Sequence, residues 1–104
     1  AASTGIAESK LSGYEDTLKS IYSNNYGDSF EDIADAMAVV NQQMGDLDQK
    51  SLQSITESAF TLRDTFGYDV QESVRAASAM VNQFGIDGDK AMNLIAAGAQ
   101  NGLD

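Results

Sequence analysis

The residues best able to do chemistry in this sequence are its carboxylates, because 16 Asp and Glu stand against 6 Lys and Arg. The most site-like group is the segment GIDGD at residues 85–89, where two aspartates lie two positions apart between glycines, as in part of a calcium loop. An EF-hand loop needs a third acidic position and a later Glu, whereas Lys90 and Met92 follow here. The pattern therefore favours a helix capped by Asp87 over a metal site, and the same holds for GDLD at residues 45–48.

A second group of carboxylates is close together in the sequence: Asp28, Glu31, Asp32 and Asp35. Glycoside hydrolases use two carboxylate side chains that face one another across a cleft. A helix here would place all of them except Glu31 on the face opposite Phe30 and Met37. We therefore expect a solvated acidic face rather than a lined cleft.

Several residue types on which enzymes depend are missing, since the chain contains no His, Cys, Trp or Pro. Without Cys there is no thiolate nucleophile, disulfide or zinc thiolate site. Without His the usual general base near neutral pH and the commonest transition-metal ligand are also missing. We therefore predict no catalytic, cofactor-binding or metal-binding residue in this segment and no enzymatic activity.

The formal net charge of −10 limits the partners of the chain. Such a surface repels phosphate backbones and anionic lipids, so we expect neither nucleic-acid binding nor binding to an anionic membrane surface. No apolar run approaches the roughly 20 residues that a membrane-spanning helix needs.

Apolar residues recur at intervals of three and four along most of the chain, as they do in helices with one buried face. In one segment they occupy positions 52, 55, 59, 62 and 66. Glycines at positions 27, 45, 67 and 85 follow the apolar stretches. The predicted helix caps after these glycines are Ser29, Asp48, Asp69 and Asp87. The sequence thus predicts an all-α fold of antiparallel helical hairpins, with helices at about 8–24, 29–44, 48–66, 69–84 and 88–101.

The chain also contains a modest internal repeat with a period of about 40 residues. When residues 26–62 are aligned with residues 66–102, seven of the 37 positions are identical, and the helix breaks coincide. We expect one helical segment over residues 1–104, excerpted from a longer chain, with repeat units at about 26–65 and 66–104. Either a compact bundle or a short solenoid fits this pattern, and so does a chance similarity between two helix–turn–helix segments of equal length.

The aromatic residues lie near predicted helix ends or on the apolar stripes, so we expect them to fill the core or to wedge helices apart. They are Tyr14, Tyr22, Tyr26, Phe30, Phe60, Phe66, Tyr68 and Phe84. Phe60 falls off the apolar stripe of its helix, which makes it the best candidate for a partner-binding patch. The small residues at 96–99 favour a close helix crossing.

Three blocks of the sequence resemble the core region of phage tail tape measure proteins from siphophages and prophages of Gram-positive bacteria. The blocks are NNYGDSFEDIADAM (24–37), LRDTFGYDVQESVRAA (62–77) and FGIDGDKAMNLIAAGAQNGLD (84–104). They match in order and cover nearly the whole chain, with the weakest support over residues 1–13.

This resemblance implies a structural role in tail assembly and in setting tail length, within a much longer parent chain. It also implies a place in the lumen of the virion tail tube, and in the host bacterial cytoplasm during assembly. The implied partners are the tail tube protein, the tail assembly chaperones and the tail-tip proteins, and self-association is a further expectation. The family offers no catalytic motif for this region. A ruler should be extended, however, whereas the sequence predicts compact hairpins.

A freestanding helical adaptor, which binds a protein partner in a groove between hairpins, is the alternative function. It would require the native gene to end near Asp104 and to lack neighbouring tail genes. An enzyme is a third and weaker possibility, because the residue types for common catalytic sites are missing.

Overall fold

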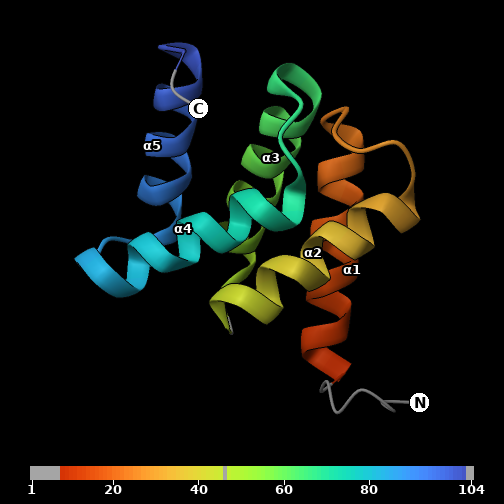
Figure 1. Ribbon diagram of the computed structural model, residues 1–104. Helices are drawn as coiled ribbons and strands as arrows, with labels where there is room; N and C mark the ends of the chain where they lie inside the picture. Colours follow the sequence, from red (N-terminus) through yellow and green to blue (C-terminus); the bar gives the residue numbers. More distant parts are fainter. Residues whose placement is uncertain (1–7, 46, 103–104) are drawn as a thin grey trace.

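The chain folds into five α-helices joined by short turns, and the computed structural model contains no strand in residues 8–45 and 47–102, which it describes, residues 8–11 by their backbone alone (Figure 1). The helices are α1 (Glu8–Ser23), α2 (Phe30–Met44), α3 (Gln49–Phe66), α4 (Val70–Phe84) and α5 (Gly88–Gln100). The all-α prediction and the number of helices are therefore confirmed.

The four predicted caps begin the last four helices. The side chains of Ser29, Asp48, Asp69 and Asp87 each accept a hydrogen bond from the backbone N–H three residues further on, over 2.7–3.1 Å. Each bond satisfies a backbone donor that the first turn of a helix leaves without a partner. At the other ends, Gly45, Gly67 and Gly85 cap α2, α3 and α4 with positive φ angles. Gly27 also has a positive φ angle but lies in the loop after α1, which ends at Ser23 and is followed by Asn25 with a φ of 70°. These local signals explain why the helix boundaries follow the sequence so closely.

The helices form two layers (Figure 1). Helices α1, α3 and α5 lie side by side and run in the same direction, while α2 and α4 cross them obliquely on one side. Successive helices are therefore steeply inclined to one another rather than strictly antiparallel. The extents of the molecule are 45 × 29 × 19 Å.

Helix α3 is the centre of the packing, because it contacts each of the other four helices. It contributes a large share of the buried side chains, and every other helix contributes at least one. The buried apolar residues are Ile21, Ile33, Ala36, Met37, Val40, Leu52, Ile55, Ala59, Phe60, Leu62, Val74, Ala77, Ala91 and Met92. One continuous core thus spans all five helices.

The aromatic predictions are only partly confirmed. Tyr14, Tyr26, Phe66 and Tyr68 pack against the core as expected. Three others expected in the core or between helices are exposed instead: Tyr22, Phe30 and Phe84. Phe30 is the first residue of α2 and lies over Tyr22, with 4.5 Å between the ring centroids.

The expectation that the aromatic residues fill the core is confirmed for Phe60, whereas its choice as the best candidate for a partner-binding patch is wrong. Its side chain is 0% exposed and belongs to the core, so it cannot form a surface patch for a partner. A stripe pattern assumes that a helix buries one face, but α3 is covered by helices of both layers. A residue beside the stripe of such a central helix is therefore buried as well.

Candidate functional site

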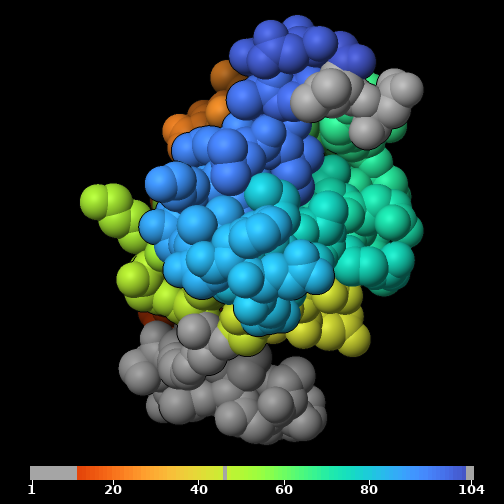
Figure 2. Space-filling view, turned by 60° about the vertical axis from the view of Figure 1, so that its left-hand side comes forward, coloured from red at the N-terminus to blue at the C-terminus, as the bar shows by residue number. Residues whose placement is uncertain are grey.

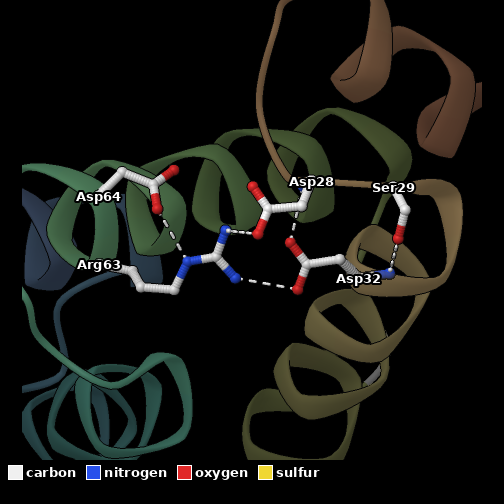
Figure 3. Close-up of polar contacts among 5 residues, drawn as sticks. All are labelled: Asp28, Ser29, Asp32, Arg63 and Asp64. Carbon is white, nitrogen blue, oxygen red and sulfur yellow. Dashed lines mark hydrogen bonds and ion pairs between the residues drawn. The ribbon is translucent and has the colours of Figure 1, made fainter.

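The most concentrated group of charges lies around Arg63, in the last turn of α3 (Figure 3). Its Nη1 donates to Oδ1 of Asp32 over 2.9 Å, and its Nε donates to Oδ1 of Asp64 over 2.9 Å. Its Nη2 lies 3.7 Å from Oδ2 of Asp28. The cluster thus joins the end of α3 to the first turn of α2 and to the loop before it.

Local hydrogen bonds hold the acidic side of this cluster in place. The backbone N–H of Asp32 donates to Oγ of Ser29, and Oδ2 of Asp32 accepts from the backbone N–H of Asp28 (Figure 3). This reciprocal arrangement is close to a capping box, with aspartate in place of the usual glutamate. Negative charge in a first turn also interacts favourably with the helix dipole. The start of α2 therefore orients the carboxylate of Asp32 independently of its ion pair with Arg63.

The core orients the basic side of the cluster. The guanidinium carbon of Arg63 lies 4.7 Å from the centroid of the Phe60 ring, one turn earlier on α3. This is cation–π geometry, which favours a cation held away from water. Nη2 of Arg63 is buried and has no hydrogen-bond partner among the described residues, so its approach to Asp28 is ionic only. Arg63 is thus packed by the core as well as paired.

The ion pair changes the titration of both groups. The hydrogen bond from Arg63 lowers the pKa of Asp32 below its ordinary value, against the smaller opposing effect of burial. The same hydrogen bond raises the pKa of Arg63, so this side chain stays charged at any accessible pH. An ionised Asp32 already engaged with a fixed cation is a poor general acid or base, and the pair acts as a link between α2 and α3.

A shallow groove of about 250 Å³ begins at this cluster and runs between α2 and the start of α4. Its apolar lining comes from Ala36, Val39 and Val70, and its polar lining from Asp32, Asp35, Arg63, Asp69 and Gln71. The predicted solvated face is correct for Asp28 and Asp35, which are exposed, but wrong for Asp32, whose side chain is only 26% exposed. Asp32 is partly covered because the end of α3 and the start of α4, which are more than 30 residues away in the sequence, lie beside it.

The two loops with calcium-like spacing act as helix starts where they are described. Oδ1 of Asp87 accepts from the N–H of Lys90 over 2.7 Å, and Asp48 does the same for Ser51. The hydrogen bond from Ser51 lowers the pKa of Asp48. Asp46 lies outside the described residues. Gly88 serves close packing, since a Cβ there would lie 2.6 Å from Cδ1 of Ile55.

Neither a metal-ligand cluster nor a membrane-spanning helix is found among the described residues. Within 8–45 and 47–102, no three His, Cys, Asp or Glu side chains lie where they could share a metal ion. Over the same part of the chain, no helix is both long and apolar enough to span a bilayer.

Replacing Asp32 with asparagine is expected to lower the free energy of unfolding by about 1 kcal/mol at pH 7, because the partly exposed ion pair is lost. Since folding lowers the pKa of Asp32, its contribution is complete above the unfolded pKa of about 4 and is lost as pH falls through the folded value. Urea unfolding at a series of pH values should show the gap between the two chains closing in acid. Asp35→Asn is the matched control on an exposed carboxylate and should change stability by less than about 0.5 kcal/mol. An equal effect of the two substitutions, or a gap that does not narrow as the pH falls, would contradict this role for Arg63.

The sequence analysis identified Asp28 and Asp32 of this cluster but neither Asp64 nor Arg63. A usable signal was present, because Arg63 is the only basic residue between Lys50 and Arg75 and follows a core aromatic by three positions. Its partner Asp32 is 31 residues away, however, and nothing local connects the two.

Comparison with known proteins places the chain in a family. No curated protein and no solved structure matches it. The sequence model described as "Phage-related minor tail protein" matches residues 19–104, which include the end of α1 and all of α2 to α5. The match covers the Arg63 cluster, the groove and most of the core. The chain therefore belongs to the family of phage-related minor tail proteins, structural components of the phage tail.

Proposed function

We propose that this chain is a non-catalytic structural segment of a tail tape measure protein, from a siphophage or prophage of a Gram-positive host. The family match over residues 19–104 supports a structural role in the tail, and the resemblance of the three sequence blocks to tape measure proteins supports the finer proposal. In this role it acts in the cytoplasm of the host during assembly and then in the lumen of the tail tube. Its partners are the tail tube protein, the assembly chaperones, the tail-tip proteins and copies of itself.

The compact fold bears on how such a segment measures length. As one continuous helix, 104 residues would span about 156 Å at 1.5 Å per residue. The five-helix fold has a longest dimension of 45 Å. We infer that this region serves tail assembly as a folded module, and that its folded dimensions rather than its residue count set its contribution to length.

An in-frame deletion of residues 26–104 in the parent gene tests both statements, with tails measured by electron microscopy. A region that lies in the tube as extended helix would shorten the tail by about 120 Å when deleted. A folded module would shorten it by no more than 45 Å, or would stop assembly altogether. Normal numbers of tails with unchanged length would contradict a part in either tail length or tail assembly.

The matched control keeps the residue count and removes the fold. Phe60→Asp places a charge in the centre of the core and should unfold the bundle. Because this variant has the full number of residues, a ruler that counts residues would still give tails of normal length. We expect assembly to fail instead, since the folded module is lost.

A helical adaptor is the second candidate, and the groove between α2 and α4 is the observation that favours it. At about 250 Å³ this groove is smaller than the 300–1,000 Å³ typical of small-molecule pockets and much too small for a helix. The length of the parent reading frame and the genes beside it distinguish the two functions.

A further inference from the structure

We propose that the exposed face formed by α4 and α5 is a docking surface for a further helical hairpin of the same kind, which extends the two layers beyond α5. The proposed contact is of the kind that already joins neighbouring hairpins within this chain, and it does not depend on the function proposed above. It rests on the interface already present between α2–α3 and α4–α5, on its counterpart 40 residues later, and on the distribution of charge.

The existing interface combines small and apolar residues with polar and charged ones. Ala36 and Val39 of α2 line the same groove as Val70 of α4. Further along, Oγ of Ser78 on α4 donates to the carbonyl oxygen of Gln43 on α2 over 2.8 Å. At the C-terminal end of α2, Sδ of Met44 and the side chain of Ile55 lie against Gly88 at the start of α5. A Cβ added to Gly88 would be 3.0 Å from Sδ of Met44 and 2.6 Å from Cδ1 of Ile55. The hairpin α4–α5 thus places the small residue Gly88 against the large side chains of Met44 and Ile55 on the hairpin α2–α3.

The same positions recur on the next hairpin. Helices α2 and α4 begin and end 40 residues apart, at 30 and 70 and at 44 and 84, while the start of α5 is 39 residues after that of α3. Asp32 and Asp35 also line the groove on α2, and the uncharged α2 positions that face α4 and α5 are Ala36, Val39, Gln43 and Met44. Their counterparts in α4 are Ala76, Ala79, Gln83 and Phe84, and all four are exposed. Phe84 is 67% exposed, although its counterpart Met44 packs against the core.

Most of this face of a strongly acidic chain carries no charge. The counterparts of Asp32 and Asp35 are Glu72 and Arg75, which form an ion pair with each other in the first half of α4. No charged residue occurs in 76–86, which covers the last nine residues of α4, or in 91–103, which covers most of α5. In addition to Phe84, the large apolar side chain of Leu94 on α5 is 48% exposed. Figure 2 shows the second half of α4 and α5 side by side on one surface, in cyan and blue. Loss of charge together with exposed aromatic and aliphatic residues is typical of the centre of a protein interface.

The occupant that fits this face is a hairpin rather than a second complete copy of the chain. In the other direction the stack is already covered, because α1 lies against both α2 and α3 (Figure 1). A second copy stacking head to tail would therefore meet α1 and not an open hairpin. A following unit with the α4–α5 pattern would bring Val70, Ser78 and Gly88 equivalents to the face, as in the interface already formed.

The test extends the 104-residue chain with a copy of residues 65–104 directly after Asp104, which keeps the 40-residue register. Because the chain contains no Trp, Phe84→Trp introduces a single fluorescent reporter on the face. In the 104-residue chain the indole should show the emission and the acrylamide quenching of an exposed side chain. In the extended chain we expect a blue shift and a several-fold loss of quenching, with a rise in helical circular dichroism.

Two variants make the result specific. Ala79→Asp on the same face should restore exposed-type emission in the extended chain, since docking would bury a charge, and should leave the stability of the 104-residue chain unchanged. Tyr22→Trp is a reporter on an exposed residue of α1 and should not respond to the extension.

Three outcomes would overturn the proposal. The added unit could fold while the indole at position 84 stays exposed, or it could fail to gain helix. The 104-residue chain could also self-associate in sedimentation experiments with the indole already buried, which would assign the face to a second copy.

Discussion

Replacing Phe60 with alanine is expected to lower the free energy of unfolding by about 3–5 kcal/mol, the cost of removing a buried phenyl ring and leaving a cavity. The ring is fully buried, lies beside Gly27 and supports the guanidinium of Arg63. Because small domains are stabilised by only about 5–15 kcal/mol, this loss would leave the chain close to unfolding. Urea titration followed by circular dichroism measures the change.

Phe84→Ala is the matched control, because it removes the same atoms from a side chain that is 67% exposed. Its expected effect is below about 0.5 kcal/mol in the 104-residue chain. The spacing of the sequence leads to the hypothesis that Phe60 is, among the aromatic residues, the best candidate for a partner-binding patch. Equal losses for the two substitutions would restore that hypothesis and would remove α3 from the centre of the core.

Gly27→Ala is expected to lower the free energy of unfolding by about 2–5 kcal/mol. The residue has a φ angle of +77°, a region that costs an L-residue about 1–2 kcal/mol. The new Cβ would also lie 2.5 Å from Cγ1 of Ile33 and 3.3 Å from Cζ of Phe60. Both neighbours are fully buried, so relieving the overlap requires movement of the core, at a further cost of about 1–3 kcal/mol.

Gly85→Ala separates the two contributions. Its φ angle is +69°, but nothing lies within 4 Å of its added Cβ, so only the backbone cost of about 1–2 kcal/mol should remain. In an Ile33→Ala background, Gly27→Ala should cost no more than Gly85→Ala, because the overlapping atom is gone. If Gly27→Ala and Gly85→Ala proved equally destabilising in the original background, the close contact would have no energetic weight.

The parts of the fold that could be predicted from sequence are those that depend on contacts between neighbouring residues. Helix starts and ends depend on groups within three or four residues, such as Oδ1 of Asp87 and the N–H of Lys90. The period of the apolar residues likewise depends only on the geometry of a helix. The number of helices, their caps and their boundaries therefore followed from the sequence.

The candidate site was less predictable for the same physical reason. The orientation of Asp32 is local, since it bonds to Ser29 and Asp28, and the sequence indicated an acidic first turn there. Its ion pair with Arg63 depends on where the end of α3 lies relative to α2. The shallow groove depends further on the position of α4. No pattern within one helix contains that information.

The sequence by itself determined the class of fold, the helix limits and the resemblance to tail proteins, because caps, periodicity and matching blocks are properties of neighbouring residues. Tertiary structure alone decided that Phe60 is buried and Phe84 exposed, although both are aromatic residues near apolar stripes. Phe60 lies on a helix with neighbours in both layers, whereas Phe84 is the last residue of α4 and is 67% exposed. Burial depends on how many other helices lie against a given face, and that number is set by packing between distant segments rather than by spacing within one.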